Sequence, residues 1–151
     1  MANTYSKIYL HIVFSVLRRE YLISKMHKED LHKYITGIIS KRKQKLLAIN
    51  CMPDHIHILV DYKPSMPLPD LVRDIKANSS GFINKQKWVK GQFNWQEGYG
   101  VFSYSQSQKS SVIKYIQEQE KHHIRSSFKE EYLKLLKRFN VDYDERYLFD
   151  L

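Results

Sequence analysis

The fold is determined by residues 46–60, which read Leu-Leu-Ala-Ile-Asn-Cys-Met-Pro-Asp-His-Ile-His-Ile-Leu-Val. Two apolar, strand-like runs, 46–51 and 55–60, are separated only by Met-Pro-Asp at 52–54. Proline and aspartate favour turns, and so short a connection can join only antiparallel neighbours. The sequence therefore predicts a β-hairpin at the centre of the chain.

The second arm of this hairpin carries two histidines. Side chains of a strand alternate between its faces, so His55 and His57 should point one way and Ile56, Ile58 and Val60 the other. Imidazole is the commonest metal ligand among side chains, and a pair on a rigid strand can supply two neighbouring donors. A solvent-facing histidine pair on a half-buried strand is the alternative, and this stretch alone does not decide between them.

The rest of the chain alternates strand-like and helix-like patterns around the hairpin. Apolar runs rich in β-branched and aromatic residues predict strands, and apolar residues spaced i, i+3, i+4, i+7 predict amphipathic helices. His11, inside the first strand, is expected to be a core histidine. We expect strands over 5–16, 46–51, 55–60 and 101–105, and helices over 24–43, 68–83, 107–125 and 128–139.

This order, β-α-β-β-α-β-α, predicts an α+β fold, a ferredoxin-like β-α-β-β-α-β antiparallel sheet with helices packed on one face. The third helix could then cross a face of the sheet and meet the histidine pair. A C-terminal helix and an acidic, aromatic tail over 140–151 would be additions that pack back or contact a partner. We expect one domain over residues 1–151, with a core of about 5–125 and a C-terminal helical extension of about 127–151.

Composition narrows the classes of function. Lys and Arg number 25 against 16 Asp and Glu, giving a net charge of +9 that favours a polyanionic partner, most often nucleic acid. The single cysteine, Cys51, excludes a disulfide framework and favours a reducing cytoplasm. No apolar run approaches the ~20 residues of a membrane span, and the polar N-terminus lacks the layout of a signal peptide. We therefore expect a soluble cytoplasmic protein without a membrane partner.

Tyr115 and Gln119 lie one helical turn apart in the predicted third helix, on the border between its buried and exposed sides. The expected buried sector consists of Val112, Ile113, Ile116 and Ile124. A tyrosine at such a border could be held by packing while its hydroxyl reaches a substrate, or it could be an ordinary core-edge residue. His122 and His123 follow, and they could bind metal, contact phosphate or cap the helix.

Two groups of residues are candidates for contacts with nucleic acid. Lysines interleaved with aromatic rings suit the backbone and the unpaired bases of a single strand. A positive helix C-terminus and a core tryptophan are the structural alternatives. The candidates are Lys41, Arg42 and Lys43 at the end of the first helix, and Lys87, Lys90 and Trp95 in a later loop.

Two motifs together resemble a known family. His55-Ile56-His57 follows Met-Pro-Asp, and the run Gly-Tyr-Gly-Val-Phe-Ser at 98–103 leads to Tyr-Ile-Gln-Glu-Gln at 115–119. This pattern, from the Tyr9 strand to about Tyr132, is similar to the single-tyrosine HUH transposases of small bacterial insertion sequences, the IS200-like transposases.

The resemblance implies a ferredoxin-like domain that cuts and rejoins single-stranded DNA at hairpin-forming ends through a covalent 5′-phosphotyrosine. It implies that Tyr115 is the nucleophile and that His55, His57 and Gln119 bind a divalent metal. We expect Mg²⁺ or Mn²⁺ at this neutral donor set, although zinc would be favoured on affinity alone. A homodimer with active sites shared between subunits is also implied.

Three alternatives remain open from the sequence. The residues His122-His123-Ile124-Arg125 match the His-x-x-Arg element of tyrosine recombinases, but those enzymes need a larger helical domain and an upstream arginine. A ferredoxin-like nucleic-acid-binding module of the RNA-recognition type would carry aromatic residues where this hairpin carries His-Ile-His. A domesticated transposase that binds DNA without mobilising it would have the same sequence features.

Overall fold

A four-stranded antiparallel sheet forms the centre of the protein. In the computed structural model, which describes residues 3–149, the strand order is β2-β3-β1-β4. The strands are β1 (Tyr9–Ser15), β2 (Lys45–Met52), β3 (His55–Asp61) and β4 (Gly100–Tyr104). The first and last two residues of the expected domain, 1–2 and 150–151, lie outside the described part.

The β2–β3 hairpin turns where the sequence predicts it. Met52 pairs with His55 across the turn, and β1 pairs antiparallel with both β3 and β4, so β3 is an inner strand. Ile56, Ile58 and Val60 point to one face of the sheet and belong to the main hydrophobic core. The predicted α+β fold with an antiparallel sheet is confirmed.

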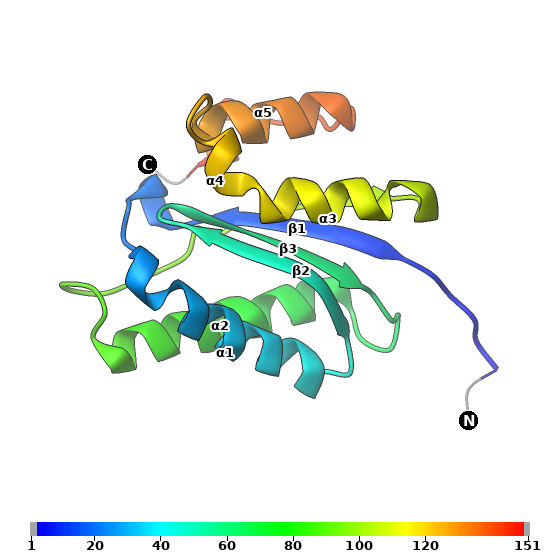
Figure 1. Ribbon diagram of the computed structural model, residues 1–151, viewed down its shortest axis with the longest axis horizontal. Helices are drawn as coiled ribbons and strands as arrows, with labels where there is room; N and C mark the ends of the chain where they lie inside the picture. Colours follow the sequence, from blue (N-terminus) through cyan, green and yellow to red (C-terminus); the bar gives the residue numbers. More distant parts are fainter. Residues whose placement is uncertain (1–2, 150–151) are drawn as a thin grey trace.

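Two long helices cover the face of the sheet that carries these isoleucines. They are α1 (Lys28–Lys41) and α2 (Leu68–Gln86), which lie side by side below the sheet in Figure 1. Pro67 and Pro69 flank the first residue of α2, where a missing backbone N–H does not break a helical hydrogen bond. The core between these helices and the sheet includes Ile12, Phe14, Leu31, Ile35, Leu71 and Ile75.

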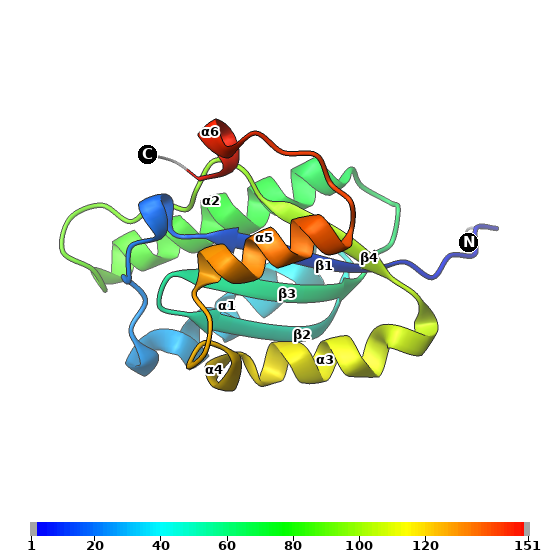
Figure 2. The same cartoon turned by 90° about the horizontal axis from the view of Figure 1, so that it is seen from above.

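The opposite face, which carries the histidine pair, is covered by α3 (Lys109–Gln117), α4 (Gln119–His122) and α5 (Phe128–Arg138). Figure 2 shows α5 lying over β1, with α3 running along the β2 side. Helices therefore cover both faces, and the expectation that the helix after the last strand crosses the histidine face is met. A short α6 (Glu145–Leu148) follows, and Phe149 packs against Phe128 and Tyr132.

The third helix is shorter than the sequence predicts. It is interrupted at Glu118, whose backbone (φ −97°, ψ 21°) leaves the helical region, and α4 ends at His122. Ile124 consequently lies beyond the helix and is 84% exposed, so its predicted place in the buried sector is wrong. Val112 and Ile116 are buried as expected, and Ile113 is partly buried. None of the described helices is long and apolar enough to cross a membrane.

Close approach of α5 to the sheet depends on Gly100. A Cβ atom at this position would lie 2.8 Å from the Cε1 and hydroxyl oxygen of Tyr132 and 3.2 Å from Phe102. Tyr132 is itself buried, with 4% exposure, so its ring has little room to move. The absence of a side chain at position 100 therefore allows α5 to dock.

We predict that Gly100→Ala destabilises the protein by about 1–3 kcal/mol, the usual cost of overpacking a filled site. Chemical denaturation measures this change. Gly98→Ala is the matched control, because the nearest atom to its Cβ would be 3.9 Å away. Equal stability of the two variants would contradict the docking role of Gly100.

Candidate active site

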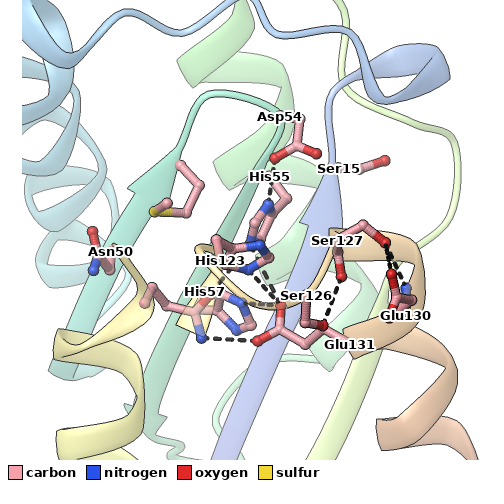
Figure 3. A network of polar contacts seen from close by, with 12 residues as sticks. Ser15, Asn50, Asp54, His55, His57, His123, Ser126, Ser127, Glu130 and Glu131 are labelled. Carbon is pink, nitrogen blue, oxygen red and sulfur yellow. Dashed lines mark hydrogen bonds and ion pairs between the residues drawn. The ribbon is translucent and has the colours of Figure 1, made fainter. Parts of the chain in front are cut away.

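His55 and His57 project together from β3 into the space beneath α5, and both are fully buried. His55 Nδ1 donates to Asp54 Oδ1 at 2.6 Å, within the hairpin turn (Figure 3). Burial lowers the pKa of His55, which favours the neutral ring. A carboxylate that holds the Nδ1 proton leaves the Nε2 lone pair free for a ligand, the usual arrangement behind a metal-binding histidine.

His57 has a comparable partner in β1. Its Nδ1 lies 2.7 Å from Nε2 of His11, and the two rings stack with centroids 5.0 Å apart. Burial and the neighbouring His57 lower the pKa of His11 well below its usual value. A neutral His11 can therefore accept the Nδ1 proton of His57 and leave the Nε2 atom of His57 facing α5. The expected core histidine thus also orients the pair.

Tyr115 and Gln119 reach the same space from the α3–α4 break. Asn50, opposite His57 on β2, donates through Nδ2 to the carbonyl oxygens of Ile116 (2.8 Å) and Gln117 (3.5 Å). In a continuous α-helix the Lys121 N–H would bond the Gln117 carbonyl, but here it bonds the Glu118 carbonyl. Asn50 therefore supports the interruption that directs Gln119, which is fully buried, towards His55.

The side chains of all these elements meet at Glu131 of α5, which is 7% exposed. Its Oε2 accepts from Gln119 Nε2 (2.9 Å) and from the Tyr115 hydroxyl. Its Oε1 lies 3.1 Å from His57 Nε2 and 3.5 Å from His55 Nε2. Burial raises the pKa of Glu131, but the charge of His57 and hydrogen bonds from His123 and His57 outweigh it and hold that pKa far below its usual range. Glu131 is therefore a buried carboxylate anion.

Tyr115 is held as a neutral phenol. Burial, and then the negative charge and hydrogen bond of Glu131, raise the pKa of its hydroxyl well above its usual value. Its ring also contacts His57 edge-on, with centroids 5.8 Å apart. A cation in this space would offset the negative charge that disfavours the tyrosinate.

The two adjacent histidines at the end of α4, His122 and His123, have different surroundings. His123 joins the cluster, with Nε2 3.1 Å from Glu131 Oε1 and its ring centroid 4.5 Å from that of His55. Burial alone would lower the pKa of His123. The hydrogen bond to Glu131 and the negative charge of Glu131 outweigh burial, so the pKa of His123 is raised. His122 is exposed and instead packs its ring 4.9 Å from the Tyr115 ring.

The donor atoms available here fit a divalent metal. One nitrogen or oxygen atom from each of His55, His57, His123 and Glu131 lies within 4.8 Å of all the others. Gln119 Oε1 adds a fifth donor, 3.3 Å from His55 Nε2. Imidazole nitrogens with carboxylate and amide oxygens suit first-row divalent ions, including Mn²⁺.

A groove of about 1190 Å³ opens between α3, α4 and α5 and leads to the cluster. Tyr115, His123 and Glu131 are among the residues that line it. Its lining also includes four exposed cationic side chains, those of Lys121, Arg125, Lys134 and Arg138. The groove therefore offers an anionic ligand a positively charged route to the tyrosine hydroxyl.

Comparison with known proteins agrees with this geometry. The sequence profile of the family described as "Transposase IS200 like" matches residues 4–119. The chain belongs to this family. The ISDra2 transposase TnpA of Deinococcus radiodurans is 22% identical over 114 residues, covering 72% of this chain and 81% of that protein.

Two solved structures share the fold of this transposase. A crystal structure of a putative transposase from Deinococcus radiodurans has a TM-score of 0.63 at 21% identity, covering 79% of this chain and 95% of that one. A REP-associated tyrosine transposase bound to a REP hairpin has a TM-score of 0.59 at 16% identity, covering 82% and 73%. The antiparallel sheet with its covering helices is therefore a fold that transposases use.

The basic residues singled out from the sequence lie elsewhere in the transposase. Three of them lie at the end of α1, which finishes at Lys41 and is followed by Arg42 and Lys43. The other two lie at the end of α2, where Lys87 is the C-cap, and in the loop that follows, at Lys90. All five therefore belong to the helix layer on the other face of the sheet. Arg42 Nε is also paired with Asp74 Oδ2 at 2.7 Å. Their contact with DNA stays a prediction.

Trp95 requires a correction. Its ring is 6% exposed, packs edge-on against Phe14 and Phe93, and donates through Nε1 to the Ser79 hydroxyl at 2.9 Å. The indole therefore belongs to the core between the sheet and α2 and has no free face on which a base could stack. The expectation that Trp95 contacts bases is wrong.

Glu131 is the site residue that the sequence analysis missed. A detectable signal was present, because Glu131 stands three residues after Phe128 and four before Leu135, on the apolar side of its helix. A carboxylate on such a side is rarely buried without a partner. The partners come from β3, α3 and α4, which only the folded chain brings together.

We predict that Asn50→Ala loosens the α3–α4 junction and destabilises the transposase by about 1–3 kcal/mol, because the buried Ile116 carbonyl loses its side-chain donor. Hydrogen exchange should quicken at the amides of 116–122. Asn78→Ala is the control, since Asn78 is exposed and donates to a carbonyl of its own helix. Unchanged exchange in the Asn50 variant would refute this support.

Proposed function

We propose that this transposase cuts and rejoins single-stranded DNA at the ends of an insertion sequence through a covalent 5′-phosphotyrosine on Tyr115. The observation that carries the proposal is the convergence of the Tyr115 hydroxyl, the Gln119 amide and the His57 imidazole on one carboxylate. The nucleophile candidate Tyr115 and the metal-ligand candidate His57, 58 residues apart in sequence, thus share one buried space.

The reaction exchanges one phosphodiester for another. The Tyr115 oxygen attacks the phosphorus and loses its proton, the bond from phosphorus to the 3′ oxygen breaks, and the departing 3′ oxygen takes up a proton. The phosphate stays on Tyr115 as an ester, so the bond is conserved for the return step. A second 3′-hydroxyl then attacks the phosphotyrosine, joins the new strands and restores the phenol.

His55, His57 and Gln119 would hold the divalent metal, which we propose to be Mg²⁺ or Mn²⁺. When bound, such an ion polarises the scissile phosphate and neutralises charge that develops on its non-bridging oxygens. Asp54 and His11 keep the two imidazoles oriented through their Nδ1 atoms. The residues of the chain therefore align the phosphate for attack by Tyr115.

The groove between α3, α4 and α5 is the proposed path of the DNA strand. Its cations, Lys121, Arg125, Lys134 and Arg138, can neutralise successive phosphates, and Tyr115 lines the same groove. A single strand is favoured over a duplex, because its flexible backbone can bend into such a groove. The REP hairpin bound by a relative of the same fold supports a hairpin-forming substrate.

The predicted homodimer is not needed to assemble this cluster. Tyr115, Gln119 and the histidine pair of one chain already meet around Glu131 of the same chain. We therefore propose that each subunit can cut with its own tyrosine, and the dimer stays a prediction.

We predict that Tyr115→Phe abolishes the covalent protein–DNA adduct and retains DNA binding, because only the nucleophilic oxygen is lost. The substrate is single-stranded DNA from the flanks of the transposase gene, incubated with Mn²⁺ or with chelator. Denaturing electrophoresis and peptide mass mapping detect the adduct. Tyr147→Phe, which alters a 79% exposed tyrosine, should behave as the wild type.

Strand cutting that persists in Tyr115→Phe would refute the nucleophile assignment. Tight binding of every flank by the wild type, with no adduct in Mn²⁺, would instead favour a domesticated, binding-only protein.

We predict that His57→Ala lowers the rate of adduct formation by at least about 100-fold at fixed Mn²⁺, as expected for loss of a metal ligand. His27→Ala is the control, because that imidazole stacks on Trp88 and lies outside both the groove and the donor cluster. The Mn²⁺ concentration for half-maximal activity should shift only in the His57 variant. An equal response of both variants would contradict the ligand role.

A further inference from the structure

Glu131 lies outside the part of the chain that the family profile matches, which ends at residue 119. It is contributed by α5, whose apolar residues Phe128, Tyr132 and Leu135 anchor that helix over the histidine face of the sheet. The position of Glu131 is therefore set by packing and not by a flexible loop.

The Glu131 carboxylate faces three imidazoles, two from β3 and one from the turn after α4. Oε1 is 3.1 Å from His57 Nε2, 3.5 Å from His55 Nε2 and 3.1 Å from His123 Nε2. Figure 3 shows the three imidazoles and the carboxylate pointing at one another between β3 and α5. Oε2 is turned towards Gln119 Nε2 and the Tyr115 hydroxyl, so the two oxygens have separate partners.

These separations match those of donors that share one ion. Nitrogen and oxygen ligands lie about 2.0–2.2 Å from a first-row divalent metal, so neighbouring ligands are about 2.8–3.6 Å apart at octahedral and tetrahedral angles. The distances from Glu131 Oε1 to the three imidazole nitrogens fall in this interval, as does the 3.3 Å from His55 Nε2 to Gln119 Oε1. An ion could enter with small movements of these side chains.

We propose that Glu131 is a protein ligand of the metal and adds a negative charge to the set of His55, His57 and Gln119. The proposal rests on the metal-dependent function proposed above and deepens it. Two imidazoles and an amide are neutral, whereas a carboxylate gives the site one formal negative charge and a hard oxygen donor suited to Mn²⁺ or Mg²⁺. Metal binding then depends on the docking of α5.

Metal binding without DNA tests this directly. Mn²⁺ is titrated into the full-length protein, and the free ion is measured by electron paramagnetic resonance. Glu131→Gln, which keeps the shape and removes the charge, should raise the dissociation constant for Mn²⁺ at least about tenfold. Glu130→Gln is the matched control, because Glu130 is the exposed preceding residue of the same helix and should leave the constant unchanged.

The outcomes separate this inference from the proposed function. If Glu131→Gln binds Mn²⁺ as tightly as the wild type or more tightly, while His57→Ala loses binding, Glu131 is a competitor of the ion and the inference fails alone. If the wild type binds no Mn²⁺, the metal-dependent function fails with it.

A second measurement can overturn the inference on the wild type alone, without any variant. Wild-type protein labelled with ¹³C at the glutamate carboxyl carbon is loaded with Mn²⁺ and studied by electron–nuclear double resonance. A strong ¹³C coupling, lost in Glu131→Asp but retained in Glu130→Gln, would support direct ligation. Absence of coupling in the Mn²⁺-loaded wild type would overturn it.

Discussion

The carboxylate of Glu131 lies within 3.5 Å of imidazole nitrogens from β3 and from the turn after α4, in a space that solvent barely reaches. Removing a carboxylate from water is costly unless donors or cations replace the lost hydration. Three imidazoles, an amide and a phenol supply that replacement here. The arrangement of α5 over the sheet therefore depends on this polar cluster as well as on the apolar contacts of Phe128 and Tyr132.

The sheet constrains the same cluster from below. The antiparallel register places Val13 opposite His57 in β1 and Asn50 opposite His57 in β2, so the inner position of β3 fixes which side chains can surround the pair. Asp54 orients one imidazole and His11 the other. A shift of one residue would turn both histidines into the isoleucine core, so the register that builds the core also builds the site.

Local patterns in the sequence correctly predicted the features that depend on neighbouring residues alone. The hairpin followed from two strand-like runs and a proline turn, and the shared face of His55 and His57 followed from alternation along a strand. The break at Glu118 was missed because its support is a hydrogen bond from Asn50 of β2 to the Ile116 carbonyl, 66 residues away in sequence. The sequence left the burial of Trp95 undecided for a similar reason, since Ser79 of α2 accepts its N–H. Composition shows that an aromatic residue is present, but not which side of the sheet receives it.

The site joins β3 to α5, two elements that are far apart in sequence, and this affects how the site can open. His57 and Glu131 are 74 residues apart in sequence, and a surface helix can detach in a partial opening that leaves the central strands intact. Detachment of α5 would separate Glu131 from the histidines while β1 and β3 stay paired. The free energy of that opening is distinct from the free energy of global unfolding, so the intactness of the site and the stability of the whole protein can vary independently.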